Sequence, residues 1–392
     1  MAKGWHSKTL PLSLFLASAV LSQTALAGDW SLLSFITEKG DFNDNYRLKP
    51  ISRGAVFGSI TDVNVDLIHK SAIDRFDLVG DLAYQRYFGP GEADVPQRFT
   101  PRLSGLYHLG GKTDTLDLQA SYIVDDVSTF DPLDPTTLAS NAVRQSRSAS
   151  AAYSHALDLR NTVGTSLSLQ DVTFSDGGTG GTPSFTIDLS TYWNYRLTKT
   201  TNFRTTAGFD SQSLKDFQNT TNLSYWVRGD LSSTVLKNLQ LNVGGGPRLG
   251  VTSLDNIFFP SEPRISNTTL GWIADASLIY TFKSGTLSAS ASHSVDPSAF
   301  GDLQTRTSFS VSAAKRLNEE SQVALTAQYR ISSSAASADQ TIFLISPTYN
   351  YQLDRQWSMS AGYRWTSTQS NLGSGSSNDV FLSVTKAFVL NP

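Results

Sequence analysis

The sequence contains no cysteine, and it has only two methionines and five histidines among its 392 residues. The lack of cysteine excludes a disulfide framework and any metal site built on thiolates. After residue 27 the sequence also lacks an uninterrupted apolar run of the ~20 residues that a membrane-spanning helix needs. A helical membrane protein is therefore excluded. Positive and negative residues are nearly balanced, with a formal net charge of −3. A chain without excess positive charge is not expected to bind nucleic acid.

The N-terminal residues have the three parts of a secretory signal. Lys3 and Lys8 supply positive charge, residues 9–22 are mostly apolar, and Ala25-Leu26-Ala27 forms a small-residue cleavage site. We therefore expect residues 1–27 to be a signal peptide. No linker, charge block or composition shift divides residues 28–392, so we expect them to form a single domain.

Alternation of apolar and polar residues is the dominant pattern in the rest of the sequence. Residues 357–366 read Trp-Ser-Met-Ser-Ala-Gly-Tyr-Arg-Trp-Thr, with apolar or aromatic residues at odd positions and small or polar residues at even positions. Successive side chains of a strand point to opposite faces, so this segment has one apolar and one polar face. Its length matches the ~9–11 residues that a tilted strand needs to cross a bilayer.

The same alternation recurs along the chain, with Trp and Tyr gathered near the ends of the segments. It is clearest in residues 185–197, 270–282, 287–291, 309–313, 323–331 and 343–351. Aromatic residues at strand ends are typical of the two girdles of a membrane barrel. We therefore predict an all-β fold, a transmembrane antiparallel β-barrel in contact with the lipid of the bacterial outer membrane. A large soluble β-sandwich or β-solenoid, which also alternates, is the other interpretation.

Short and long connections also alternate, and they give the strand count. Short ones are expected at 69–74, 109–114, 157–161, 197–201, 236–238, 282–285, 317–321 and 353–356. Longer polar loops are expected at 88–98, 126–144, 174–183, 214–219, 252–268, 296–303, 333–339 and 369–377. With a first strand at Trp30–Thr37 and a loop at 38–52, the barrel has about 18 strands and both termini on the periplasmic side. The count falls to about 16 if two short segments do not pair.

The expected size decides the broad class of function. Barrels of about eight strands are filled by their own side chains, whereas barrels of about 16–18 strands leave an aqueous channel. A plugged transporter needs a separate N-terminal domain, and too few residues precede the second strand to form one. The sequence therefore predicts an open channel.

The alternation assigns charged and aromatic residues to the polar side of the wall, where they are candidates for lining the channel. From the direction of each strand, the residues expected near the mid-height of the barrel are Asp81, Asp188, Arg228, Asp275 and Arg364. Arg102 and Arg330 are expected nearer the outer mouth, and Arg204 is expected nearer the periplasm. Such charges set the field that a solute crosses, although they can equally be solvated residues that only keep the lumen wet. Their mixed signs predict no strong preference for anions or cations.

A few aromatic residues and two loops depart from the general pattern. Tyr87, Tyr192 and Trp226 fall on the polar side, where they favour the passage of sugars, unless a β-bulge shifts the alternation by one residue. Loops 126–144 and 252–268 are candidates for folding inward as a constriction, or they are ordinary surface loops.

Catalytic and metal-binding signals are weak. His108 falls on the polar side, but the spacing reveals no acid or serine partner for it. The acidic residues at 125–134 lack the glycine and the closing glutamate of a calcium-binding loop. We therefore expect neither an enzyme nor a bound metal or cofactor.

Several segments resemble a known family. The runs Tyr349–Leu353, Trp357–Trp365 and Ser376–Val384, together with Asp44-Asn45 and Ile60-Thr61-Asp62-Val63, are similar to the beta-barrel porins of proteobacterial exopolysaccharide gene clusters. The resemblance covers most of residues 28–392 in layout. It implies a wide outer-membrane channel for export of an extracellular polysaccharide, with periplasmic export components as partners. Size and polarity alone predict a passive porin for small solutes, and an outer-membrane enzyme or an adhesive barrel is a third alternative.

Overall fold

The structure is a computed structural model that describes residues 29–92, 95, 97–126, 142–175, 181–216, 218–255, 265–297, 303–334, 339–370 and 373–390. The expected signal peptide at residues 1–27 lies outside this part of the chain. In the described residues, no helix is long and apolar enough to cross a membrane.

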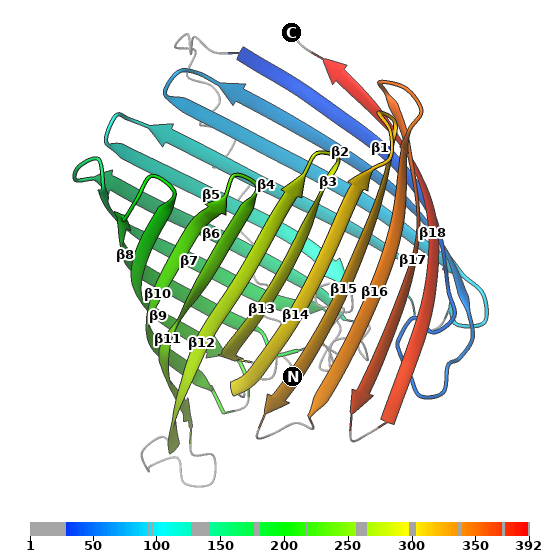
Figure 1. Ribbon diagram of the computed structural model, residues 1–392. Helices are drawn as coiled ribbons and strands as arrows, with labels where there is room; N and C mark the ends of the chain where they lie inside the picture. The colour runs from blue at the N-terminus through cyan, green and yellow to red at the C-terminus, as the bar shows by residue number, and fades with distance from the viewer. Residues whose placement is uncertain are drawn as a thin grey trace, which may run out of the picture.

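The described chain forms one sheet of eighteen antiparallel strands, which closes on itself because β1 pairs with both β2 and β18 (Figure 1). The strands are β1 (Asp29–Asn43), β2 (Val56–Lys70), β3 (Asp74–Phe88), β4 (Arg98–Gly110), β5 (Asp114–Asp126), β6 (Val143–Ala156), β7 (Asn161–Ser175), β8 (Ser184–Arg196), β9 (Thr201–Leu214), β10 (Thr221–Leu236), β11 (Leu239–Leu254), β12 (Ile265–Phe282), β13 (Gly285–Pro297), β14 (Leu303–Arg316), β15 (Ser321–Ser334), β16 (Gln340–Gln352), β17 (Trp357–Ser370) and β18 (Gly373–Leu390). The predicted count of 18 is therefore confirmed, and the alternative count of 16 is wrong.

The apolar face of the sheet points outward. In β3, Leu82 and Tyr84 are 42% and 47% exposed, whereas Ala83 between them is 7% exposed. The same alternation leaves large apolar side chains exposed on the outer side of nearly every strand. An exposed apolar belt of this size needs lipid around it, so the soluble sandwich and the solenoid are excluded.

Aromatic rings mark the rim of the wall nearest the short turns. Trp30 begins β1, Trp357 begins β17 and Phe388 lies near the end of β18. The Nζ atom of Lys386 lies 5.0 Å from the ring centroids of both Trp357 and Phe388. A lysine between interfacial rings keeps its charge at the headgroups while its stem lies along lipid. This rim is one boundary of the bilayer.

Four of the short turns share one sequence pattern, in which a leucine precedes Asp, Asn or Thr. In the turn at 157–160, Asp158 Oδ1 accepts the backbone N–H groups of Arg160 at 2.6 Å and Asn161 at 2.8 Å. Asn318 and Asp354 accept the equivalent pairs of N–H groups in their own turns. These side chains satisfy the orphan donors of a tight turn. All eight predicted short connections are confirmed by the strand bounds.

The outer ends of three strands differ from the expectation. The first strand continues to Asn43 rather than ending at Thr37, so the predicted loop at 38–52 shrinks to residues 44–55. The predicted loop at 369–377 is wrong, because β17 extends to Ser370 and β18 begins at Gly373. Residues 38–43 are mostly polar and residues 369–377 are rich in Gly and Ser, so both resemble a loop in composition. Ladder pairing with their neighbours nevertheless keeps Glu38–Asn43 and Gly373–Ser377 extended.

Three prolines lie inside strands, namely Pro101, Pro247 and Pro347. A proline cannot donate to the ladder, and in an open sheet it is confined to edges or bulges. A closed barrel has no edge strand, so a proline inside one of its strands interrupts the backbone hydrogen bonds to a neighbouring strand. The pairing of β16 with β17 passes from Ile345 directly to Thr348, which leaves Pro347 unpaired on that side.

Candidate functional site

The inner face of the barrel is polar and carries the charges that the alternation assigned to it. All ten candidate lining residues lie at positions that alternate with the exposed apolar residues of their strands, namely Asp81, Arg102, Asp188, Tyr192, Arg204, Trp226, Arg228, Asp275, Arg330 and Arg364. Their expected heights are wrong in part. Arg102 lies directly opposite Asp81 in the register of β3 and β4, so the two share one level instead of two.

A first cluster joins β8 to β11 at the outer part of the wall. Asp188 lies opposite Asp210, whose Oδ2 is 3.0 Å from Arg248 Nη2. The indole Nε1–H of Trp226 donates to both oxygens of Asp210, at 3.2 and 3.1 Å. Arg248 also donates to Ser224 Oγ at 3.2 Å. Trp226 and Arg248 are therefore held in place by one carboxylate.

A second cluster continues the charged wall from β10 to β12. The Arg228 guanidinium forms ion pairs with both Asp230 and Asp275. Arg228 thus bridges two carboxylates, and the group as a whole carries an excess of negative charge. Gly244 lies between them, and a Cβ at this position would collide with Asp230 Oδ1. The absence of a side chain at Gly244 leaves the space that the Arg228–Asp230 ion pair occupies.

The wall formed by β17, β18 and β1 carries a more loosely paired group. Arg364 Nη1 lies 3.9 Å from Asp379 Oδ2, the pair being directly opposed in the register of β17 and β18. Asp379 and Asp41 are both buried, and in each the Oδ1 atom lacks a hydrogen-bond partner in the described structure. Lys39 Nζ lies 5.1 Å from the ring centroid of Phe381 on the same wall.

Four aromatic rings on the inner wall lie directly opposite a glycine. The pairs are Tyr87 with Gly58, Tyr192 with Gly164, Trp226 with Gly208 and Phe381 with Gly362. In every pair the ring occupies the space that a Cβ on the glycine would need. No bulge interrupts the register at these positions, so the aromatic residues belong to the inner face and the bulge alternative is wrong for Tyr87, Tyr192 and Trp226.

Phe381 is an inner-wall ring that the sequence reading missed. Its neighbours Val380 and Leu382 are exposed apolar residues, so the local sequence reads as one apolar run without alternation. The feature that indicates an inward-facing ring is Gly362, which lies directly opposite Phe381 in the register of the β17–β18 hairpin. Tyr192, in contrast, was assigned from sequence, and Arg204 lies 3.7 Å from its ring centroid.

The remaining inner wall is lined mainly by hydroxyl groups. Between β13 and β14, Ser288 and Ser312 are 2.6 Å apart and Ser292 and Ser308 are 2.7 Å apart. Equivalent hydroxyl pairs join β5 to β6 and β7 to β8. These hydroxyl pairs offer a solute many weak hydrogen bonds. Arg330 adds one positive charge directly opposite Ser308.

Residues 44–55 fold inward over the outer end of the wall. The Tyr46 ring packs edge-on against Tyr87, with centroids 5.5 Å apart, beside the buried cluster of Val56, Tyr87 and Val95. Leu48, held at φ 51°, is 7% exposed. The side chain of Asn45 fixes this segment by donating to the carbonyl groups of Lys49 and Ser376. The sequence did not single out this connection as one that folds inward.

The two loops that the sequence did single out lie mostly outside the described residues. Residues 127–141 of the first loop and residues 256–264 of the second lie outside the described residues. The ends of the first loop are described and differ from the expectation: Asp125 and Arg144 belong to β5 and β6, and they form a bidentate ion pair at 3.1 Å with 7% exposure of each side chain. The pair closes the hairpin at its outer end.

Histidine partners exist that the spacing did not reveal. His108 Nδ1 lies 2.6 Å from Asp117 Oδ1, so the expectation that His108 has no acid partner is wrong. The two residues are opposed in the register of β4 and β5, and only that register brings them together. His155 and Tyr153 both contact Asp114 Oδ1, at 2.8 and 2.5 Å. Within the described ranges, no group of three or more His, Cys, Asp or Glu residues could hold a metal ion.

No protein-family model matches this sequence, and no curated protein sequence is similar to it. Solved structures do share its fold. OccK9 (OpdG) of Pseudomonas aeruginosa is 11% identical, with a TM-score of 0.50 over 92% of this chain and 99% of that chain. OccAB3 of Acinetobacter baumannii is 10% identical, with a TM-score of 0.48 over 92% and 100%. A loop-deletion mutant of OmpT, an outer-membrane protein of Vibrio cholerae, is 10% identical, with a TM-score of 0.44 over 92% and 100%.

The fold is that of an outer-membrane porin. The closed sheet, the exposed apolar belt and the polar interior all agree with this architecture, and they place the barrel in the outer membrane. The resemblance to porins of exopolysaccharide gene clusters gains no support from the family comparison.

Proposed function

We propose that this chain is a passive outer-membrane channel for small hydrophilic solutes, and that it catalyses no reaction. The supporting observation is a closed wall of eighteen strands whose inner face is polar. Barrels of about 16–18 strands enclose water, because their side chains are too short to fill the interior. Water inside and lipid outside account for the alternation along the whole sequence.

The charged clusters on the inner wall are the proposed determinants of ion selectivity. Around Arg228, one cation faces the two carboxylates of Asp230 and Asp275. Arg248 faces Asp210 and, beyond it, Asp188. A wall with both signs of charge favours neither ion strongly, so we expect the unmodified channel to be weakly selective.

Single-channel recording in planar bilayers tests this proposal. The purified protein should give stable open steps in KCl, with a reversal potential near zero in a salt gradient. Arg228→Gln leaves Asp230 and Asp275 without their cation, so it should raise the permeability ratio of K⁺ to Cl⁻ on the order of twofold. Asp275→Asn should shift the ratio in the opposite direction. A protein that inserts without conducting would refute the proposal.

Export of an extracellular polysaccharide is the second candidate. It is favoured by the rings that lie against a glycine, above all Trp226, whose indole N–H is held by Asp210. Such a ring offers a flat apolar face, which can stack on the apolar face of a sugar ring, beside carboxylate and guanidinium groups that bind hydroxyls. Periplasmic export components are expected as partners only under this candidate.

Current block by a neutral oligosaccharide distinguishes the two candidates. A channel for polymeric sugars should be blocked by maltohexaose in bilayer recordings, and Trp226→Ala should weaken the block about tenfold, on the scale of an aromatic contact. Tyr225→Ala is the matched control, because Tyr225 is the neighbouring ring on the opposite, exposed face. Free passage of the sugar without block, equal in both variants, would leave the small-solute porin as the function.

A further inference from the structure

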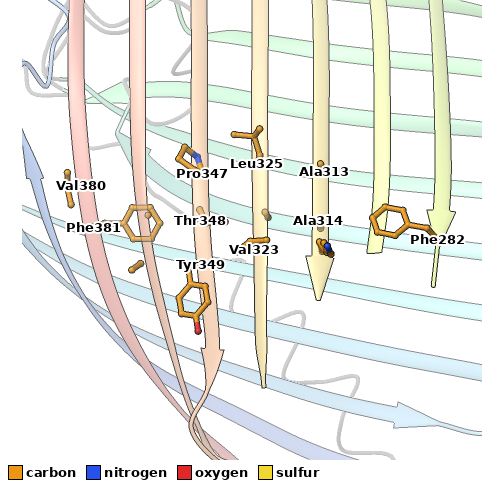
Figure 2. Close-up of a pocket in the computed structure, with 14 residues that line it drawn as sticks. Phe282, Ala313, Ala314, Val323, Leu325, Pro347, Thr348, Tyr349, Val380 and Phe381 are labelled. Atoms are coloured by element: carbon orange, nitrogen blue, oxygen red, sulfur yellow. The ribbon is translucent and has the colours of Figure 1, made fainter. Parts of the chain in front are cut away.

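A groove of about 780 Å³ crosses the wall from β12 to β18. Figure 2 shows its lining residues spread over neighbouring strands, from Phe282 on β12 to Val380 on β18. The side chains of Val323, Leu325 and Tyr349 belong to the exposed apolar series of their strands, so the groove opens on the outer, lipid-facing side.

Small residues hollow out this part of the outer wall. Ala313 lies opposite Leu325, and Leu325 lies opposite Pro347 on the next strand. In the next row toward the turns, Tyr349 lies opposite Ala361. Large and small side chains thus alternate across four strands, and the small ones leave a depression between the large ones. A second, smaller hollow shares Tyr349 and Ala361 with the groove and extends it toward Leu382.

The groove lies in the half of the wall nearest the short turns. Phe282 is the last residue of β12, and Lys315 is the penultimate residue of β14. Both chain ends of the described barrel lie at this rim, which faces the periplasm in the predicted orientation. The groove is therefore bordered by the inner leaflet of the outer membrane.

A cation lies at the end of the groove that meets the headgroups. Lys315 lines the groove, is exposed and has no ion-pair or hydrogen-bond partner in the described part of the chain. Lys283 is also exposed on the same rim, in the turn between β12 and β13, two residues before Gly285, the register partner of Lys315. An exposed lysine at the membrane boundary attracts anionic lipid headgroups.

We propose that the groove is a binding site for an anionic phospholipid of the inner leaflet. Its phosphate pairs with Lys315, and one acyl chain lies in the hollow over Ala313, Pro347 and Ala361. Large side chains at either end of the hollow, Phe282 and Val380, limit the position of the chain.

Photo-crosslinking locates the lipid directly. The full barrel is reconstituted in phosphatidylcholine vesicles with a small fraction of phosphatidylglycerol that carries a diazirine on one acyl chain. After illumination, the labelled peptides are identified by mass spectrometry. Adducts should concentrate on residues 311–325 and 345–363. Lys315→Gln should reduce them about fivefold, as expected for the loss of one basic contact with an anionic headgroup.

Matched variants separate a defined site from general contact with lipid. Ala361→Phe should fill the hollow and remove most adducts, whereas Ala207→Phe, on the exposed face of β9, should leave them unchanged. Lys112→Gln, in the turn between β4 and β5, is the control for charge. Retention of the folded, heat-resistant form on gels checks that each variant is intact. Adducts spread evenly around the belt, equal labelling by a phosphatidylcholine probe, or crosslinked dimers in place of lipid adducts would overturn the proposal.

Discussion

At the scale of single residues, glycine decides where a ring can lie on the inner wall. Gly208 is the clearest case, because a Cβ there would collide with Cζ2 of Trp226. Because Gly208 has no side chain, the indole ring packs directly over its backbone. In this orientation, Nε1 of Trp226 is within hydrogen-bonding distance of Asp210. The glycine therefore positions a hydrogen bond that it does not itself make.

Gly208→Ala should consequently displace Trp226 from the wall. We expect a loss of about 1–3 kcal/mol in the free energy of unfolding, the usual cost of overpacking, and a lower single-channel conductance as the ring moves into the lumen. Urea unfolding and bilayer recording measure the two effects. Gly80→Ala is the control, since the Cβ there would meet Leu103 Cδ1 at an ordinary 4.0 Å. Equal behaviour of both variants would show that the glycine has no such role.

The sequence predicted which face each lining residue occupies but not its neighbours. Side-chain alternation is local, so the inner assignment of Arg228 or Asp275 needs only its own strand. The ion pair between them, like the contact of His108 with Asp117, depends on the register between strands. Register is set by the turns and by pairing across the sheet, and a single strand carries little information about either.

At the scale of elements, the turns carried the strongest sequence signal. Asp158 shows why, because its carboxylate accepts backbone N–H groups of Arg160 and Asn161 and the side-chain N–H of Asn161. These hydrogen bonds, the one from Arg160 first, hold the pKa of Asp158 below its usual value. Loops 38–52 and 369–377 were predicted with wrong bounds, because ladder pairing, which a local sequence pattern does not encode, continues to Asn43, Ser370 and Gly373.

The lowered pKa gives this turn a defined pH dependence. The contribution of Asp158 is complete above the usual carboxyl pKa of 3.8 and is lost as the pH falls through the lowered folded-state value. Amide hydrogen exchange at Arg160 and Asn161 should therefore lose protection in acid. Glu320 and Ser321 should not, because the acceptor in their turn is the uncharged Asn318.

The effects of substitutions at Asp158 follow from the same hydrogen bonds. Asp158→Ala should remove the protection at neutral pH as well, whereas Asp158→Asn should retain it and abolish its pH dependence. Parallel loss of protection at both turns in acid would point to global opening of the barrel and against a local carboxylate effect.

At the scale of the whole molecule, the ion pairs of the inner wall gather in two places. Clusters lie on β8 to β12 and on the wall of β17, β18 and β1, while the sheet between them carries hydroxyl pairs together with Asp81, Arg102 and Arg330. The exterior shows the opposite contrast, an apolar belt with lysine at its turn-side rim. The described interior has few buried apolar residues, so the closed ladder and the surrounding lipid hold the fold.

The inward connection at 44–55 packs on the inner wall at the outer rim, and we expect it to limit the size of the mouth. Its packing rests on Tyr46 against Tyr87 and on the buried Leu48, whereas its hydrogen bonds to β18 use Asn45. Replacing Tyr46 and Arg47 with serine and Leu48 with glycine removes the packing and leaves the β1 ladder intact. We expect a larger conductance and a free energy of unfolding lowered by about 2–5 kcal/mol, the usual cost of losing a buried apolar side chain. The positive φ at Leu48 favours glycine and offsets part of this loss.

Ile51→Ser is the control for this change, because Ile51 belongs to the same connection but is 85% exposed. It should leave the conductance unaltered. The two proteins are compared in the same bilayer at several KCl concentrations, so that a change in mouth radius is separated from a change in local charge caused by the loss of Arg47. A wider mouth raises the conductance at all salt concentrations, whereas a charge effect fades at high salt. Unchanged conductance at high salt in the triple variant would mean that the constriction lies deeper, at the charged clusters of β8 to β12.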